Sequence, residues 1–269
     1  MAFDTQITDL IGGTIDQVAC DQWAADACRE IINQLPSSLK AKCAAATTLS
    51  NSPTVMDMDA VGDILHVTRL SADSGGYQVS VRSIPAMYGG LATDSTDLNY
   101  FGTVTDPVYW IDGNTSDAAT LYVKPTPTSA QTAIVHHISY PTVDVSAVSV
   151  IANFPDEAEY LGVLYVAAKQ LLQYQSTMSS SWNIDITTAL TNAQNVINGN
   201  QPSATTDAFG ALDNEDVEIM TASLQLASSQ FAEAGARLQQ DSSKYQWYGD
   251  QYAKLTAEYA RGLAALKGG

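Results

Sequence analysis

The sequence predicts an α+β fold: a helical bundle with an inserted β-rich domain and a long C-terminal helix or helical hairpin. Apolar residues recur at helical spacing toward both ends of the chain, and their spacing changes toward two between residues 47 and 141. A heptad pattern runs through the last fifth of the sequence. The chain has 269 residues, 45% of them apolar, so it can bury one large core or two modest ones.

Two helices are predicted in the N-terminal segment 5–34, where apolar residues recur every three or four positions. The glycine pair at residues 12–13 interrupts this pattern. Thr14 and Gln17 have the spacing of a capping box, so the second helix is expected to begin there and to end before Pro36.

The three cysteines, Cys20, Cys28 and Cys43, are expected to be buried thiols. Their number is odd and no two have CxxC spacing, which argues against a disulfide framework and against a zinc site. Cys20 and Cys28 lie eight residues apart, on nearly the same face of a helix, where they would pack as small apolar residues.

β-Branched and aromatic residues accumulate between residues 47 and 141, and they predict six strands. Residues 74–76 are expected to close a hairpin between the second and third strands, and residues 112–114 to form the turn between the fourth and fifth. Residues 84–101 are expected to be irregular. The predicted strands cover residues 54–59, 64–71, 77–83, 107–112, 119–124 and 133–140.

A helix is predicted to begin near Phe154, where a proline and three acidic residues occupy the first turn. It is expected to run to about Gln175. The polar stretch 176–183 is expected to separate it from another helix over residues 185–198, which residues 199–202 would end.

The C-terminal segment carries the clearest pattern. Counting alternately by three and four from Val217 to Leu266 meets an apolar or aromatic residue at every position except Asp241 and Gly262. This is a heptad seam, and a single helix over it would be about 75 Å long. The alternative is an antiparallel hairpin with a break at Asp241 or at the serines 242–243.

These patterns divide the chain into four parts. Residues 4–36 and 155–200 would build the helical domain, residues 45–150 the β-rich domain, and residues 213–267 the long helix or hairpin. A lone helix cannot bury its seam, so we expect the seam to contact other subunits; the alternative is a core within the chain. The candidate interface residues are Phe231, Leu238, Tyr245, Tyr248, Tyr252 and Tyr259.

The charge balance argues against tight binding of DNA. Twelve Lys and Arg against 29 Asp and Glu give a net charge of −17. Between residues 125 and 236 a single basic residue, Lys169, stands among eleven acids, so DNA phosphates would slide past such a surface without sticking.

No membrane association is expected. The longest apolar run, residues 160–168, is far shorter than a membrane-spanning helix needs. The first five residues have neither the basic nor the apolar region of a signal peptide, so we expect the chain to be made and kept in a cytosol.

The histidines offer weak grounds for a metal site. His136 and His137 are neighbours in a predicted strand and point to opposite faces, so a metal would need His66 together with one of them. Strand histidines of this kind are more often satisfied by hydrogen bonds.

The run Asp57, Asp59 and Asp63 also offers little for a cation. It lacks the glycine and the terminal glutamate of an EF-hand loop and is more typical of a solvated edge or a subunit contact. We therefore predict no metal, no cofactor and no catalytic residue.

Residues 12–15, GGTI, resemble the start of the asparaginase motif, in which a threonine attacks an amide. Thr14 would then be the nucleophile. The residues before it continue a helical pattern instead of the strand that this motif requires, so an amide hydrolase is kept only as an alternative function.

Several stretches, taken in order, resemble the head-to-tail adaptor proteins of tailed bacteriophages, also called connectors or neck proteins. Residues 22–36, QWAADACREIINQLP, are similar to their first long helix. Residues 107–110 (PVYW), 121–127 (LYVKPTP) and 138–141 (ISYP) are similar to their strand series, and residues 154–169 (FPDEAEYLGVLYVAAK) to the helix that follows. The heptad tail departs from the smaller members of the family.

The resemblance implies a virion structural protein without enzymatic activity, located in the neck between capsid and tail and assembled in the host cytoplasm. It implies a homo-oligomeric ring, usually of twelve copies, that docks beneath the portal protein, leads to tail or nozzle proteins and lets DNA pass without specific binding. A second alternative to this function is an independent coiled-coil adhesion or spike module.

Overall fold

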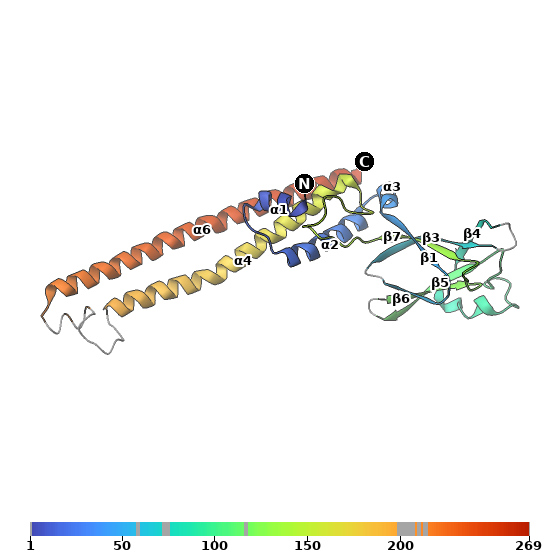
Figure 1. Ribbon diagram of the computed structural model, residues 1–269, viewed down its shortest axis with the longest axis horizontal. Helices are drawn as coiled ribbons and strands as arrows, with labels where there is room; N and C mark the ends of the chain where they lie inside the picture. The colour runs from blue at the N-terminus through green and yellow to red at the C-terminus, as the bar shows by residue number, and fades with distance from the viewer. Residues whose placement is uncertain are drawn as a thin grey trace. The chain divides into compact units, whose positions relative to one another are not determined.

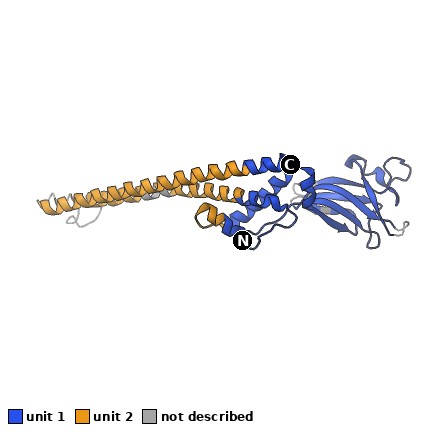
Figure 2. Cartoon of the chain, turned by 90° about the horizontal axis from the view of Figure 1, so that it is seen from above, with its two compact units in different colours: residues 1–6, 17–163, 260–269 blue, residues 7–16, 164–259 orange. Residues whose placement is uncertain are grey.

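The computed structural model describes residues 2–57, 60–71, 76–115, 118–197, 208, 211 and 215–268. The chain divides into two compact units (Figure 2). Unit 1 comprises residues 1–6, 17–163 and 260–269, and unit 2 comprises residues 7–16 and 164–259. Helices and a β-sheet are both present, which confirms the predicted α+β class. None of the helices among the described residues has the length of apolar sequence that crossing a membrane would require.

Two helices form at the N-terminus as predicted, α1 (Phe3–Ile11) and α2 (Gln17–Gln34). Gly12 adopts a positive φ of 64° and donates its amide to the carbonyl of Thr8, which ends α1. The capping-box spacing predicted that the second helix begins at Thr14, but α2 begins at Gln17. The amide of Asp16 donates to Oε1 of Gln170 (3.2 Å), so the backbone before Gln17 finds a partner outside α2.

The expected burial of the cysteines is confirmed. Cys20 and Cys28 lie on the buried face of α2, and Cys43 is buried as well; all three are free thiols. The buried residues of α2 recur at helical spacing, and they are Cys20, Ala24, Ala27, Cys28, Ile31 and Ile32.

Two short helical segments, α3 (Ser37–Lys40) and η1 (Ala41–Cys43), lead from α2 into the sheet (Figure 1). Seven strands, counted over the described residues, form one sheet in the order β1-β7-β3-β4-β5-β6-β2. Strands β4 and β5 are parallel, and the other neighbours are antiparallel. The strands are β1 (Ala44–Leu49), β2 (Thr54–Asp57), β3 (Val61–Leu70), β4 (Gln78–Ser83), β5 (Val108–Thr115), β6 (Ala118–Lys124) and β7 (Ala133–Ser139).

All six predicted strands are present, with ends that differ by a few residues, and β1 is an addition. Three alanines open β1, and alanine disfavours strands. The strand forms because it pairs along its whole length with β7, from Ala44 opposite Ile138 to Leu49 opposite Ala133.

The turn predicted at residues 112–114 is wrong. Asp112 pairs with Thr120 and Gly113 with Ala119, so both lie inside the β5–β6 ladder. The hairpin expected between the second and third predicted strands is present as the antiparallel pair β3–β4. Residues 74 and 75 of its turn lie outside the described residues.

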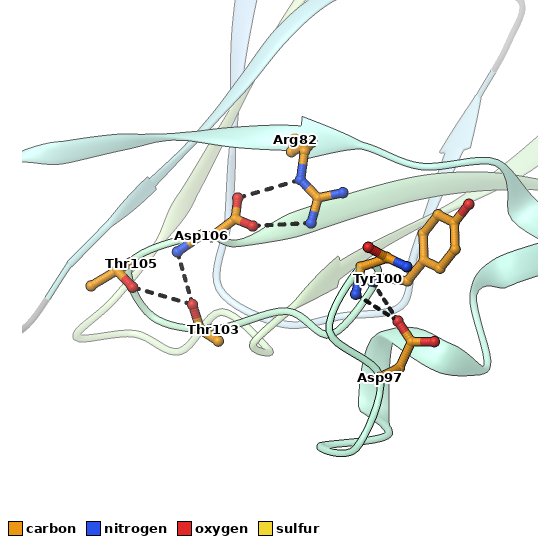
Figure 3. A network of polar contacts seen from close by, with 7 residues as sticks. Arg82, Asp97, Tyr100, Thr103, Thr105 and Asp106 are labelled. Carbon is orange, nitrogen blue, oxygen red and sulfur yellow. Dashed lines mark hydrogen bonds and ion pairs between the residues drawn. The ribbon is translucent and has the colours of Figure 1, made fainter.

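The irregular segment predicted at 84–101 is confirmed and contains two 3₁₀ turns, η2 (Ala86–Tyr88) and η3 (Leu91–Thr93). Ile84 and Ala92 of this segment pack in one cluster with Trp110 of β5, which stacks on Tyr122 with ring centroids 4.9 Å apart. Nearby, Arg82 pairs with Asp106 through Nη2 and Oδ2 at 3.0 Å, and backbone amides 99 and 100 donate to Oδ1 of Asp97 (Figure 3).

One continuous helix, α4 (Asp156–Ile197), replaces the two helices predicted between residues 154 and 198. The break expected at residues 176–183 is wrong. Here the hydroxyl of Thr177 donates to the carbonyl of Gln173 (3.0 Å) and that of Ser180 to the carbonyl of Ser176 (3.2 Å). Both hydroxyls thus bond within the helix instead of ending it. The stop predicted at residues 199–202 lies outside the described residues.

Helix α6 (Val217–Gly268) runs without interruption for 52 residues, about 78 Å. The single long helix is therefore right, and the break at Asp241 or at residues 242–243 is wrong; Ser243 donates its hydroxyl to the carbonyl of Gln239. In unit 2, α6 lies beside α4, and the two form an antiparallel helical hairpin (Figures 1 and 2).

Candidate assembly surface

Aromatic rings join α4 to α6 within unit 2. From one ring pair to the next, the residue number decreases on α4 while it increases on α6, so the two helices are antiparallel. Each tilted ring pair contributes about 0.5–1.5 kcal/mol beyond the area that it buries. The three pairs, called here the aromatic ladder, are Trp182–Tyr245, Tyr174–Tyr248 and Tyr165–Tyr259, with centroids 5.2, 5.3 and 5.7 Å apart.

The loop between α1 and α2 contacts both helices of the hairpin. The hydroxyl of Tyr174 donates to the carbonyl of Thr14, and Gln173 donates to Oδ2 of Asp16 (3.1 Å). Gln251 of α6 donates to the carbonyl of Leu10 (3.4 Å). These hydrogen bonds connect the end of α1 and the loop after it to the middle of α4 and to α6.

The six candidate interface residues divide into two groups. Tyr245, Tyr248 and Tyr259 contact α4 of their own chain through the aromatic ladder, and Tyr252 lines a cavity of about 150 Å³ between the same helices. For these four tyrosines the structure provides partners within the chain.

Phe231 and Leu238 differ from the tyrosines. Their side chains are 45% and 41% exposed, and no aromatic pair of the described residues includes Phe231. They belong to a set of large apolar side chains on α4 and α6 that begins next to the Trp182–Tyr245 end of the ladder, each between 38% and 53% exposed. We call this set the exposed seam: Ile186, Leu190, Ile219, Leu224, Leu226, Phe231 and Leu238.

A cavity of about 260 Å³ opens between the two helices beside the exposed seam. Two buried polar atoms, Nε1 of Trp182 and Oε1 of Gln230, belong to residues that line it, and neither has a hydrogen-bond partner among the described residues. One is a donor and the other an acceptor. Leu238 also lines the cavity, so this place combines apolar surface with unsatisfied polar groups.

The surface around the cavity carries little charge. Residues 176–197 and 217–241 contain only Asp185, Glu218, Glu233, Arg237 and Asp241 as charged residues, and the last three of these line the cavity. Arg237 and Glu233 form an ion pair on α6 (Nη2 to Oε1, 2.5 Å). Charge therefore neither attracts a polyanion to this surface nor strongly repels another copy of it.

The other candidate residues show no common site. Thr14 lies exposed in a loop after helix α1, where the asparaginase motif would need a strand. The side chain of Asp57 and the whole of Asp59 lie outside the described residues. Asp63 is exposed, 3.9 Å from Nζ of Lys40. In the described part of the chain, no three or more His, Cys, Asp and Glu side chains are grouped so as to hold a metal ion.

Two of the histidines differ sharply in surroundings. His137 is buried, with Nδ1 3.0 Å from the carbonyl of Ile138 and Nε2 3.0 Å from the hydroxyl of Thr47. Because a carbonyl only accepts, Nδ1 carries the proton, and this is the hydrogen-bonded strand histidine that was predicted. His136 instead stacks on His66, with ring centroids 4.1 Å apart.

The sequence reasoning missed Trp182 and Gln230. Trp182 falls in the polar stretch that was expected to break the helix, and Gln230 is not on the seam counted from Val217. Counting by three and four along α4 from Tyr165 would have found Trp182. That count meets Tyr165, Ala168, Leu172, Gln175, Ser179, Trp182, Ile186, Ala189 and Ala193, of which two are polar.

One comparison with known proteins gave a match. A family model described as "SU10 adaptor protein" matches residues 4–210, well over half of the chain. The matched range ends before α6 begins. No match was found among curated proteins.

Proposed function

We propose that this chain, which belongs to the SU10 adaptor protein family, joins the portal of a tailed bacteriophage to its tail as one subunit of a ring around the DNA path. Membership of the family makes the chain a structural adaptor of a phage and a component of the virion. The ring, the portal and tail contacts, the neck position, the passage of DNA and the absence of catalysis are the parts that we propose.

The exposed seam is the observation that carries the proposal. The aromatic ladder pairs rings of α4 and α6 with one another, but Phe231, Leu238 and their neighbours remain in contact with solvent. Large apolar side chains that stay exposed along one stretch of a hairpin are typical of a surface that a partner covers. Completing the burial of the two side chains would contribute about 1–3 kcal/mol in total.

The six candidate residues enter the proposed interface unequally. We assign Phe231 and Leu238 to its centre because they are exposed and lack the ring contacts that the tyrosines make. Tyr245, Tyr248, Tyr252 and Tyr259 would lie at its margin, because they already contact α4 of their own chain or line the cavity between the two helices.

Charge supports the proposed channel. With a net charge of −17 and Lys169 as the one basic residue between positions 125 and 236, the chain has little to hold phosphates with. A ring of such subunits would repel DNA weakly from all sides and leave it free to move.

The proposal is tested by mixing the purified full-length chain with the portal protein of the same phage and measuring the mass of the complex by native mass spectrometry. We expect a ring on the portal for the wild type, and at least about tenfold weaker assembly for Phe231→Ser combined with Leu238→Ser. Met87→Ser is the matched control, since Met87 is 79% exposed and lies in the β-sheet unit.

Each alternative function gives a different result in the same experiments. A trimer that forms without portal and ignores it would support the spike module and overturn the adaptor. Amidase activity that Thr14→Ala abolishes would support the hydrolase. Portal binding that the double variant leaves unchanged would move the interface away from the exposed seam.

A further inference from the structure

Two histidine side chains meet on the sheet of unit 1, apart from the assembly surface. His66 of β3 and His136 of β7 are direct partners in the antiparallel register of these neighbouring strands. Their rings stack with centroids 4.1 Å apart and planes within 11° of parallel. Their neighbours Val67, Val135 and His137 are buried, so the pair lies on the opposite face of the sheet from that core.

The sheet holds this pair in place. Strand β7 has β1 on one side and β3 on the other, and the ladder continues beyond the pair through Val67 opposite Val135 and Arg69 opposite Ala133. On the β1 side, His136 has Ala46 opposite, a residue with a small side chain. The two α-carbons are thereby fixed, while the side chain of His66 is exposed and that of His136 is half-buried.

Imidazoles in this arrangement suit one class of ligand. Each neutral ring offers one nitrogen lone pair, and zinc binds such nitrogens at about 2.0–2.1 Å. Rings that stack 4.1 Å apart need only turn so that a nitrogen of each points at a common ion. The side chains paired with or next to the two histidines on this face, Ala46, Thr68 and Ile134, carry no carboxylate, the ligand that Ca²⁺ and Mg²⁺ prefer.

We propose that His66 and His136 form a two-histidine site for a divalent transition-metal ion of the Zn²⁺, Ni²⁺ and Cu²⁺ class, with water in the remaining positions. Affinity should follow the order of divalent metals, with Cu²⁺ the tightest. This site is independent of the proposed function in unit 2.

The test is calorimetric titration of untagged, full-length protein with NiCl₂, ZnCl₂ or CuCl₂ in a buffer that does not bind metals. We expect one site per chain. His66→Phe and His136→Phe keep a ring for stacking and remove one ligand each. Each should weaken binding at least about tenfold, because even the loss of a group behind a metal ligand costs 10- to 100-fold. Circular dichroism checks that both variants are folded.

Two readouts distinguish a bound ion from simple ring stacking. Electron paramagnetic resonance of the Cu²⁺ complex should show two coordinated imidazole nitrogens, and one in either Phe variant. Asp63→Asn is the matched control, since Asp63 is the exposed acid on the same strand, and it should leave the affinity unchanged. The proposal is overturned if either Phe variant binds as the wild type does, or if Asp63→Asn weakens binding as much as they do.

Discussion

Cys28 illustrates how burial sets the chemistry of a single side chain. It has no exposed surface, and burial, with smaller effects of Cys43 and Glu159, raises the pKa of its thiol to about 12. Burial also raises the pKa of Cys43. Because the thiolate is the reactive form, a thiol whose pKa lies far above the solution pH does not react.

We therefore predict that the native protein is inert to a thiol reagent such as dithionitrobenzoate at pH 8. The thiol of Cys28 stays protonated below its pKa, so a rise in pH from 7 to 9 should leave the native rate near zero. In 6 M guanidinium all three cysteines should react. Rapid reaction of one thiol in the native protein would show that a cysteine is accessible.

At the scale of single elements, Gly262 of α6 lies tightly against side chains of α4. A Cβ atom on Gly262 would lie 2.5 Å from Cδ2 of Leu161 and against the hydroxyl of Tyr160. Leu161 is fully buried and has little room to move. Gly235, on the same helix, has open space where its Cβ would be.

The two glycines should respond oppositely to alanine. Gly262→Ala should lower the free energy of unfolding by about 1–3 kcal/mol, because the methyl group overfills a packed contact. Gly235→Ala should raise it by about 0.5–1 kcal/mol, because alanine stiffens the unfolded chain and favours helix. Urea unfolding of both variants checks this; equal effects would mean that α6 does not pack against Leu161 as described.

The continuity of α4 gives a second prediction at this scale. Ser180 lies inside the helix, so Ser180→Pro should cost about 3 kcal/mol by removing a backbone hydrogen bond and clashing with the preceding turn. Ser180→Ala is the matched control and should be neutral or slightly stabilising. Circular dichroism and urea unfolding measure both. A proline tolerated without loss of helix would favour the loop that the polar sequence suggested.

For the whole molecule, net charge governs how copies come together. Each chain carries −17, so neighbours in a ring repel one another, and salt screens that repulsion over about 10 Å at 0.1 M. The exposed seam, by contrast, is almost uncharged and depends on apolar burial, which salt does not weaken.

Assembly of the proposed ring should therefore become stronger as NaCl is raised from 50 to 500 mM. Sedimentation velocity at several protein concentrations measures it, with the Phe231→Ser and Leu238→Ser double variant as the control that should stay dissociated. Dissociation of the wild type at high salt would show that ion pairs, and not the exposed seam, hold the subunits together.

Local pattern predicted most of the fold. Alternation located six of the strands, helical spacing located α1 and α2, and the heptad count located α6, because each signal repeats within a window of a few turns. The burial of Cys20 and Cys28 followed from the same spacing. The order of the matching stretches was also enough to indicate the adaptor family, which the match to residues 4–210 confirms.

Contacts between distant residues decided the rest. Strand β1 exists because β7 pairs with it. Helix α4 continues through its polar stretch, where it lies beside α6. Of the six candidate interface residues, the four tyrosines have partners or a cavity within their own chain. His66 and His136 stand 70 positions apart in the sequence and meet only through the register of β3 and β7. Composition and periodicity describe what each segment can bury, but the partner that buries it is chosen among all segments at once, by pairing and packing that no local window contains.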